Sequence, residues 1–274
     1  LVYRRAKNVM DVVPFGTLQD AYATDYEWIN HSLAPTRIAD HDFRITVGPD
    51  AAQPYRASVF NISAMSFGSL SANAIRALNE GARRGGFYHD TGEGSISPYH
   101  PEPGGDLVWE LGSGYFGCRD GNGRFDPERF AEQAARPQVR MIEVKLSQGA
   151  KPGHGGVLPG AKVTSEIARA RGVPVGQDCN SPASHSAFDS PMGADCVSPS
   201  SHPEFDTPLG LLQFVARLRE LSGGKPVGFK LAIGHPWEWF AVAKAMHESG
   251  LLPDFIVVDG AGGGSGAAPV EFMD

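Results

Sequence analysis

The sequence has little cysteine, no long hydrophobic run and no excess of basic charge. Its cysteines, Cys118, Cys179 and Cys196, have neither zinc-ligand nor ferredoxin-like spacing and form no disulfide framework. We therefore expect no metal site here and a reducing, cytoplasmic setting. No run approaches the roughly 18 apolar residues of a membrane-spanning helix, and no signal peptide is evident. These absences predict a protein without a membrane segment.

Charge and size narrow the class of protein further. A net charge of -7 and a pI of about 5.7 argue against nucleic acid or an anionic membrane as a partner. The apolar fraction of 41% is enough for a hydrophobic core, and 274 residues suit one α/β barrel of roughly 250 residues. The chain starts at Leu1 and ends after a glycine-rich loop, so we expect both ends to be cut.

Strand and helix signals alternate along most of the chain. Short apolar runs predict strands at 59–67, 87–91, 107–111, 141–146, 227–232 and 255–258. Helical spacing with caps predicts helices near 71–85, 127–135, 165–171, 209–221 and 236–249. This alternation is typical of parallel βα architecture. It predicts an α/β fold, a (β/α)8 barrel over 58–274 truncated at its C-terminus after about six steps. Residues 1–57 read as an irregular extension packed on the barrel, with a short helix near 18–30.

Polar residues follow the predicted strands, where glycine-rich loops begin. The clearest example is 141–160, in which an apolar run leads to Lys145, Gln148 and Lys151 within a loop rich in glycine. Two lysines beside such a loop indicate an anionic ligand. Lys230 lies inside an apolar strand, which favours a buried anionic partner or a ligand. In a (β/α)8 barrel this end of the strands holds the active site.

One segment occurs twice. Residues 178–193 (D-C-N-S-P-A-S-H-S-A-F-D-S-P-M-G) are nearly repeated at 195–210 (D-C-V-S-P-S-S-H-P-E-F-D-T-P-L-G). Both copies cannot fill one βα step. We therefore expect one copy to form an exposed excursion, and the sequence alone leaves open which one.

Five ordered motifs carry a resemblance to a known family. They are S-A-M-S-F-G-S-L-S (63–71), T-G-E-G (91–94), K-L-S-Q-G-A-K-P-G-H-G-G-V-L-P-G (145–160), F-K-L (229–231) and D-G-A-G-G-G-S-G-A-A-P (259–269). They resemble the FMN-binding synthase domain of glutamate synthase, and more closely its stand-alone bacterial relatives. That family uses a (β/α)8 barrel with FMN at its C-terminal face. It reduces 2-iminoglutarate, formed from 2-oxoglutarate and ammonia, to glutamate.

The resemblance implies roles for individual residues. The expected cofactor-binding set is Ala64, Met65, Ser66, Lys230, Asp259, Gly260, Gly263 and Gly264, with Lys230 near the N1/O2 edge of the flavin. Lys145, Gln148 and Lys151 would bind the keto acid, and Glu93 would deliver a proton to the imine or orient it. FMN itself supplies the hydride chemistry, while the protein supplies charge and orientation.

Simpler interpretations exist for several of these residues. Ser66 would otherwise cap the first helix, and Glu93 would be a surface carboxylate beside Arg83 or Arg84. His154 is expected to be a loop residue. Cys118 is expected to be buried packing.

The chain also departs from the family. The late βα units that hold the FMN phosphate, the cysteine cluster of the iron–sulfur centre and the amidotransferase domain are absent from it. We expect an iron–sulfur cluster only through further C-terminal residues or a partner, and we expect this chain by itself to bind FMN weakly or not at all. The expected partners are 2-oxoglutarate or glutamate and a ferredoxin-like or NAD(P)H-dependent electron donor.

Two alternatives remain open at this point. One is another FMN barrel enzyme, such as a 2-hydroxy-acid oxidase or a flavin-type isopentenyl-diphosphate isomerase, acting on a related substrate. The other is an inactive fragment that serves as an interaction module, which the repeat and the missing strands favour.

Overall fold

A computed structural model describes residues 42–173, 195–265 and 268, with 6–7, 9, 20–24, 26, 30 and 32–37 nearer the N-terminus. The chain divides into two units, residues 1–41 and 42–274. In the first unit, the described residues 20–24 form a turn in which the Ala23 amide donates to the Asp20 carbonyl at 3.1 Å. The helix predicted near 18–30 has no helical residue among those described. Its other residues lie outside the described part.

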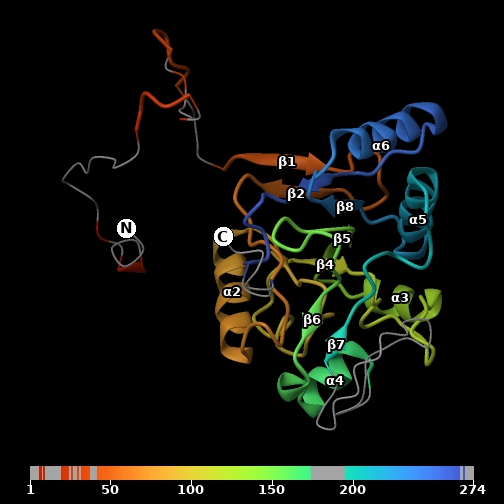
Figure 1. Ribbon diagram of the computed structural model, residues 1–274. Coiled ribbons are helices and arrows are strands. Elements are labelled where there is room, and N and C mark those ends of the chain that lie inside the picture. The colour runs from red at the N-terminus through yellow and green to blue at the C-terminus, as the bar shows by residue number, and fades with distance from the viewer. Residues whose placement is uncertain are drawn as a thin grey trace. The chain divides into compact units, whose positions relative to one another are not determined.

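A parallel sheet organises the larger unit (Figure 1). Its order is β3 (His89–Asp90), β4 (Leu107–Leu111), β5 (Val139–Lys145), β8 (Val227–Leu231) and β9 (Ile256–Val258). Every neighbouring pair in this sheet runs parallel, and Lys145 of β5 lies directly opposite Lys230 of β8. The predicted α/β alternation is confirmed. Five parallel strands, with helices in the connections after β4, β5 and β8, are consistent with part of a (β/α)8 barrel.

The strand predicted at 59–67 is wrong. Only Ile62 reaches the sheet, where its amide donates to the Tyr88 carbonyl and its carbonyl accepts from Asp90, both at 3.0 Å. Val59 and Phe60 are 74% and 69% exposed, and Phe67 at the other end of the run packs into a core cluster with Ile75 outside the sheet, so the apolar residues of this run do not form a strand. The chain leaves the sheet immediately after Ile62.

Residues 42–58 are not irregular, which corrects the expectation for 1–57. They form an antiparallel hairpin of β1 (Arg44–Val47) and β2 (Tyr55–Ser58) that belongs to the larger unit. Tyr55 and Ala57 pack against Val108 and Met141 on the inner face of the sheet. The sequence signal was weak because each strand has only four residues, too few to show a sustained alternation.

The helices begin and end close to their predicted bounds. They are α2 (Ala72–Gly85), α3 (Pro127–Ala134), α4 (Ser165–Arg171), α5 (Pro208–Leu221) and α6 (Pro236–Ser249), with a 3-10 turn η1 at Gly160–Lys162. Side chains of Ser71, Asp126, Thr164 and Thr207 cap the first four of these helices. Glycines in the left-handed conformation end α2, α4 and α6.

Side chains on the strands alternate between two chemically different faces. Trp109, Ile142 and Phe229 point outward and join a buried core with residues of α3 and α5 such as Phe130 and Leu218. The inner face carries charged residues of the same strands. The helices therefore cover an apolar face and leave a polar interior for a site.

The second copy of the repeat is part of the packed structure. Its first residues form β7 (Cys196–Val197), which pairs antiparallel with β6 (Val157–Leu158). Burial lowers the pKa of His202 to about 4, so the ring is neutral. Its Nε2 then donates to the Lys145 carbonyl at 2.7 Å, and the Tyr115 hydroxyl donates to Nδ1 at 3.0 Å. The first copy lies outside the described residues.

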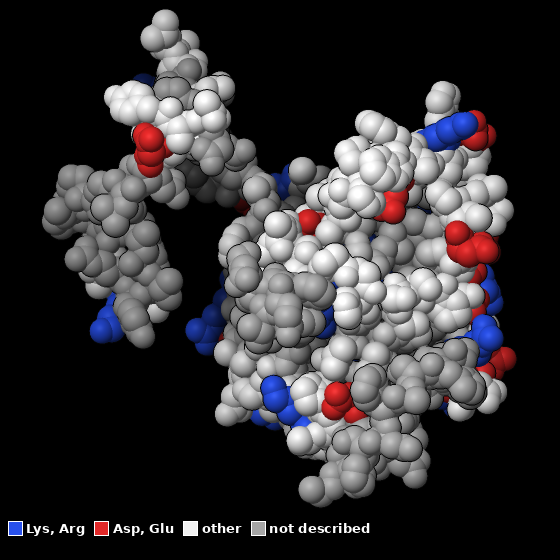
Figure 2. Space-filling view, viewed as in Figure 1, with Lys and Arg blue, Asp and Glu red and all other residues white. Residues whose placement is uncertain are grey.

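On the face shown in Figure 2, acidic and basic side chains alternate along the edge formed by α5 and α3, and uncharged residues cover much of the rest of its described part. Among the described residues, no helix combines the length and the apolar character needed to cross a bilayer.

Deleting residues 178–194 should leave the melting temperature unchanged or raise it. Both copies begin with Asp-Cys, so after the deletion Gln177 is still followed by Asp and Cys. The deletion also leaves the second copy, which packs in the structure, intact. Adding His202→Ala to this deletion should lower the melting temperature, since two buried hydrogen bonds are lost, each worth about 0.5–1.5 kcal/mol. Differential scanning calorimetry measures both. A collapse of the deletion variant alone would show that the first copy belongs to the core.

Candidate functional site

One pocket of about 420 Å³ collects most of the residues singled out in the sequence. It lies at the carboxyl ends of the parallel strands and is lined by two groups of residues. The predicted ones are Ala64, Met65, Ser66, Glu93, Lys145, Gln148, Lys151, Lys230, Asp259, Gly263 and Gly264; the others include Glu110 and Arg171. Of the predicted site residues, only Gly260 is not part of this lining. The pocket therefore brings together residues that lie 200 positions apart along the chain.

Residues 63–66 form one wall because the chain turns out of the sheet there. Ser66 does not cap α2; Ser71 does, accepting from the Ala74 amide at 3.3 Å. The Ser66 hydroxyl instead lies 3.1 Å from that of Ser69. A side chain on Gly92, whose φ is +67°, would meet the Ser66 amide nitrogen at 2.6 Å. The T-G-E-G motif thus needs glycine at this position so that the two loops can touch.

Glu93 and Lys145 form an ion pair inside the pocket. The Lys145 ammonium donates to the Glu93 carboxylate at 2.9 Å, and both side chains are largely buried. Burial alone would raise the pKa of Glu93, but Lys145, followed by Lys151 and Arg171, lowers it below its usual range. Glu93 is therefore a carboxylate at neutral pH.

The alternative that placed Glu93 on the surface beside Arg83 or Arg84 is wrong. Those two arginines pair with Glu80 on their own helix, at 2.8 and 2.6 Å.

The loop after β5 rests on the loop after β9. The Gly149 amide donates to the Asp259 carboxylate at 3.0 Å, and the Ala150 amide donates to the Gly263 carbonyl at 3.0 Å. A side chain on Gly149 would come within 1.9 Å of the Gly260 carbonyl. Gly260 therefore supports the β5 loop from outside the pocket. This packing holds Gln148, which is 9% exposed, at the pocket wall.

In the pocket lining, Lys230 lies against a cluster of buried carboxyl groups. Its ammonium is 3.5 Å from Glu110 and 3.6 Å from Asp259. Oxygen atoms of Asp90, Glu110 and Glu143, from three adjacent strands, lie within 4.8 Å of one another. All three side chains are less than 5% exposed. Three carboxylates around one ammonium would leave uncompensated charge in a buried place, so protons must be held there.

The pKa shifts follow from this arrangement. Burial, followed by the charge of Glu110, raises the pKa of Asp90 to about 8. Burial and the charges of Asp90 and Glu110 raise the pKa of Glu143 well above its usual range. Burial opposes the charge on Lys230, yet the surrounding carboxylates raise its pKa. Lys230 therefore stays charged while part of the cluster is neutral.

Several residues of this site were missed in the sequence. Arg171 reaches the pocket from the end of α4, is 4% exposed and donates to the Phe67 carbonyl at 3.4 Å, while its Nε has no hydrogen-bond partner in the described structure. Nothing in the sequence around Arg171 distinguishes it from other helix-end arginines. Glu110 and Glu143 did carry a signal, because each is one carboxylate inside an otherwise apolar strand.

His154 and Cys118 lie where the simpler interpretations placed them. His154 is exposed in the loop after β5. Cys118 is fully buried within the core.

Comparison with known proteins identifies the family. Residues 49–193 and 188–274 match the sequence profile described as the conserved region in glutamate synthase. The chain belongs to the glutamate synthase family. The resemblance seen in the five motifs is thereby confirmed. The two matched ranges overlap at 188–193, at the end of the first copy of the repeat.

Individual relatives agree with this assignment. The chain is 40% identical over 213 residues to the glutamate synthase large subunit-like protein YerD of Bacillus subtilis, covering 77% of this chain and 37% of that protein. It is 36% identical over 208 residues to an archaeal-type glutamate synthase (NADPH) of Thermotoga maritima, covering 76% and 34%. It is 31% identical over 252 residues to an archaeal glutamate synthase (NADPH) of Methanocaldococcus jannaschii, covering 91% and 42%. The chain thus spans less than half the length of these relatives.

The buried carboxyl groups make stability depend on pH. The pKa of Asp90 is about 8 in the folded protein against 3.8 for the ordinary group, so the folded state binds this proton more tightly. Its contribution to the free energy of unfolding is full below about pH 4 and is lost as the pH rises towards 8, with each pKa unit worth about 1.4 kcal/mol. Asp90→Asn should flatten that decline. Urea unfolding between pH 5 and 9 measures it, with the exposed Asp50→Asn as control. An unchanged decline in Asp90→Asn would contradict this view of the cluster.

Proposed function

We propose that this chain forms part of an FMN-dependent oxidoreductase that reduces 2-iminoglutarate, made from 2-oxoglutarate and ammonia, to glutamate. The observation that carries the proposal is the convergence of Lys145, Lys151, Arg171 and Lys230 on one pocket around Glu93. Membership in the glutamate synthase family supports the same activity. A dicarboxylic keto acid needs several cations in one place, and an acidic protein has concentrated them here.

Two buried cations in the pocket lining suit the substrate carboxylates. Lys151 is 3% exposed, and burial lowers the pKa of its ammonium, which is a cost that an anionic ligand would offset. Arg171 offers a buried guanidinium with an unsatisfied Nε. We assign these two residues to carboxylate binding, together with Lys145 and Gln148. Each of them lines the pocket.

Glu93 suits orientation of the imine better than proton donation. Its pKa is lowered, so at neutral pH it is a carboxylate that accepts a hydrogen bond from a protonated imine nitrogen. Lys145, 2.9 Å away, fixes the position of that carboxylate. We therefore keep the orienting role for Glu93 and assign the proton-bearing group of the pair to Lys145.

The pocket floor fits the charge of a reduced flavin. Lys230 lines the pocket and stays charged because the surrounding carboxylates raise its pKa. Because the raised pKa values of Asp90 and Glu143 leave part of the carboxyl cluster neutral, the cluster does not cancel this positive charge. A cation at this place would stabilise negative charge on the N1/O2 edge. FMN, when bound and reduced, supplies the hydride. We propose that Ala64, Met65 and Ser66 form the wall against the ring and that Gly263 and Gly264 border it.

Electrons would come from a partner. Two relatives carry NADPH in their names, and this concerns those longer proteins. For this chain we propose an NAD(P)H-dependent or ferredoxin-like donor. An iron–sulfur cluster would belong to further residues or to that partner, because the cysteines of this chain have no cluster spacing.

Replacing Lys230 with methionine should weaken FMN binding by at least about tenfold, because a charge-assisted contact of about 1.5–3 kcal/mol is lost. Quenching of flavin fluorescence measures the dissociation constant. Lys162→Met removes a charge from the exposed turn η1 and should bind as the wild type does. Lys230→Arg, which keeps the charge above the carboxyl cluster, should retain more affinity than Lys230→Met. Equal binding by Lys230→Met and the wild type would remove Lys230 from the flavin site.

Replacing Lys151 with methionine should weaken 2-oxoglutarate binding by about tenfold or more. The substitution preserves the length and the apolar stem of the side chain and removes only its charge. Isothermal titration calorimetry should show a smaller effect on 2-oxobutyrate, which lacks the second carboxylate. If both ligands lose affinity equally, Lys151 does not bind the distal carboxylate. If neither ligand binds the wild type, the keto-acid assignment fails and the interaction-module alternative gains support.

A further inference from the structure

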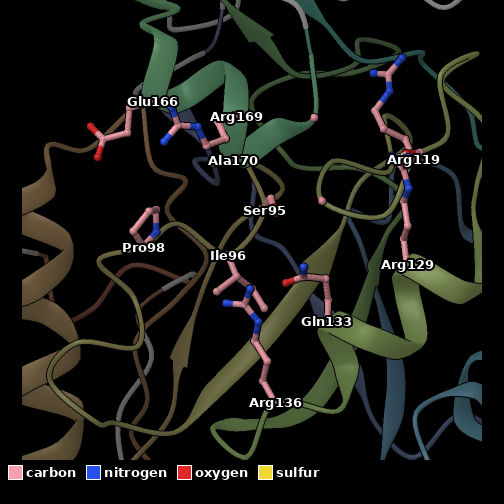
Figure 3. A pocket seen from close by; sticks show the side chains of 12 residues that line it. Ser95, Ile96, Pro98, Arg119, Arg129, Gln133, Arg136, Glu166, Arg169 and Ala170 are labelled. Atoms are coloured by element: carbon pink, nitrogen blue, oxygen red, sulfur yellow. Dashed lines mark hydrogen bonds between the residues drawn. The ribbon is translucent and has the colours of Figure 1, made fainter.

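A second concave region lies away from the proposed active site, on the helix-covered side of the sheet (Figure 3). It has a volume of about 470 Å³ and shares no lining residue with the first pocket. Its walls come from α3, from α4 and from the loop at 95–98. In Figure 3, Gln133 of α3 and Arg136, just after that helix, extend towards Ile96, and Glu166 and Arg169 extend from α4 on the opposite side. Its size is that of a small-molecule site.

The lining is strongly basic for a protein with a net charge of -7. Among the residues that the structure describes, it contains Arg119, Arg129, Arg136 and Arg169 and one acidic side chain, Glu166. Glu166 is already engaged, because it accepts a hydrogen bond from the Tyr99 hydroxyl. The pocket therefore has an excess of positive charge that its own acidic residue does not balance.

The four arginines differ in how far they are neutralised. Arg129 is paired with Asp126 at 3.4 Å and donates to the Arg119 carbonyl at 2.6 Å. The guanidinium of Arg119 is buried near the Phe116 ring, 5.7 Å from its centroid, and in Figure 3 it points away from Arg136. Within the described ranges, the side chains of Arg136 and Arg169 make no ion pair or hydrogen bond. These two guanidinium groups are the ones available to a ligand.

Unpaired guanidinium groups on opposite walls select a particular chemistry. Each presents a planar fork of N–H donors that matches two oxygens of a phosphate group. A phosphorylated molecule offers such oxygens in several directions, so it can be contacted from the segment just after α3 and from α4. Gln133 and the hydroxyl of Ser95 add neutral hydrogen-bonding groups to the same lining.

We propose that the pocket between α3 and α4 binds a small phosphorylated metabolite, with Arg136 and Arg169 holding its phosphate group. The proposal is independent of the function assigned to the first pocket. The two pockets are, however, lined by different residues of the same two chain segments. The chain segment 92–96 carries Glu93 at one pocket and Ser95 and Ile96 at the other, and α4 ends with Arg171 in the first pocket.

Inorganic pyrophosphate is a suitable probe, titrated calorimetrically at constant ionic strength adjusted with sodium chloride. The wild type should bind it, and Arg136→Gln/Arg169→Gln should bind it at least about tenfold more weakly. Arg56→Gln/Lys162→Gln removes the same amount of charge from exposed positions outside the pocket, and its affinity should stay within about twofold of the wild type. All of these positions are exposed, so the variants should have the same melting temperature as the wild type.

Three results would overturn the proposal. The first is a wild type that shows no heat of binding beyond the sodium chloride blank. The second is an equal loss of affinity in the two double variants, which would mean that only general charge attracts the probe. The third concerns the first pocket, which also contains lysines. If Lys151→Met abolishes pyrophosphate binding while Arg136→Gln/Arg169→Gln keeps it, the anion binds in the first pocket.

Discussion

The structure depends on how one buried ammonium is compensated. Lys230 enters the interior from β8 and meets carboxyl groups from three neighbouring strands, with Glu110 at 3.5 Å. An unpaired charge at this depth would cost several kcal/mol, and so would the carboxylates without the lysine. Each group is therefore tolerated only because the sheet places the others beside it. The same alternation that turns Trp109 and Phe229 outward into the helices turns Glu110 and Lys230 inward.

The pocket above this cluster is built from loops that touch one another through backbone. Gly92 lets one loop approach Ser66, and Gly149 lets another approach Gly260. His202, from a different part of the chain, holds the Lys145 carbonyl from the other side at 2.7 Å. The catalytic proposal for Lys145 therefore depends on contacts from three loops. A ligand would meet a pre-formed set of charges rather than one assembled on binding.

The duplicated segment shows how local similarity and tertiary packing differ. Both copies carry Asp-Cys, a histidine and a Pro-initiated turn. From the sequence alone, either copy could therefore form this βα step. The structure places His202 of the second copy between Tyr115 and Lys145, and places α5 immediately after it. The run at 59–67 shows the opposite case, because it looked like a strand by composition and yet only Ile62 pairs. An apolar run becomes a strand only where a neighbouring strand has free backbone groups along its length.

By itself, the sequence determined the α/β class, the approximate bounds of α2 to α6 and most of the residues singled out here that line the pocket, but not Arg171 or Glu110. Caps and left-handed glycines are local, so Ser71 and Gly172 fix their helices without help from the rest of the chain. The carboxyl ends of parallel strands lie on one side of the sheet. Lys145, Lys230 and Glu93 lie at or just after such strand ends, so the sequence pattern predicts that they lie close together. Only the tertiary structure decided the partners of each charge. The charge states and partners of Arg171 and of the carboxyl cluster depend on burial and on neighbours from other elements. Neither burial nor these neighbours can be read from the residues adjacent in sequence.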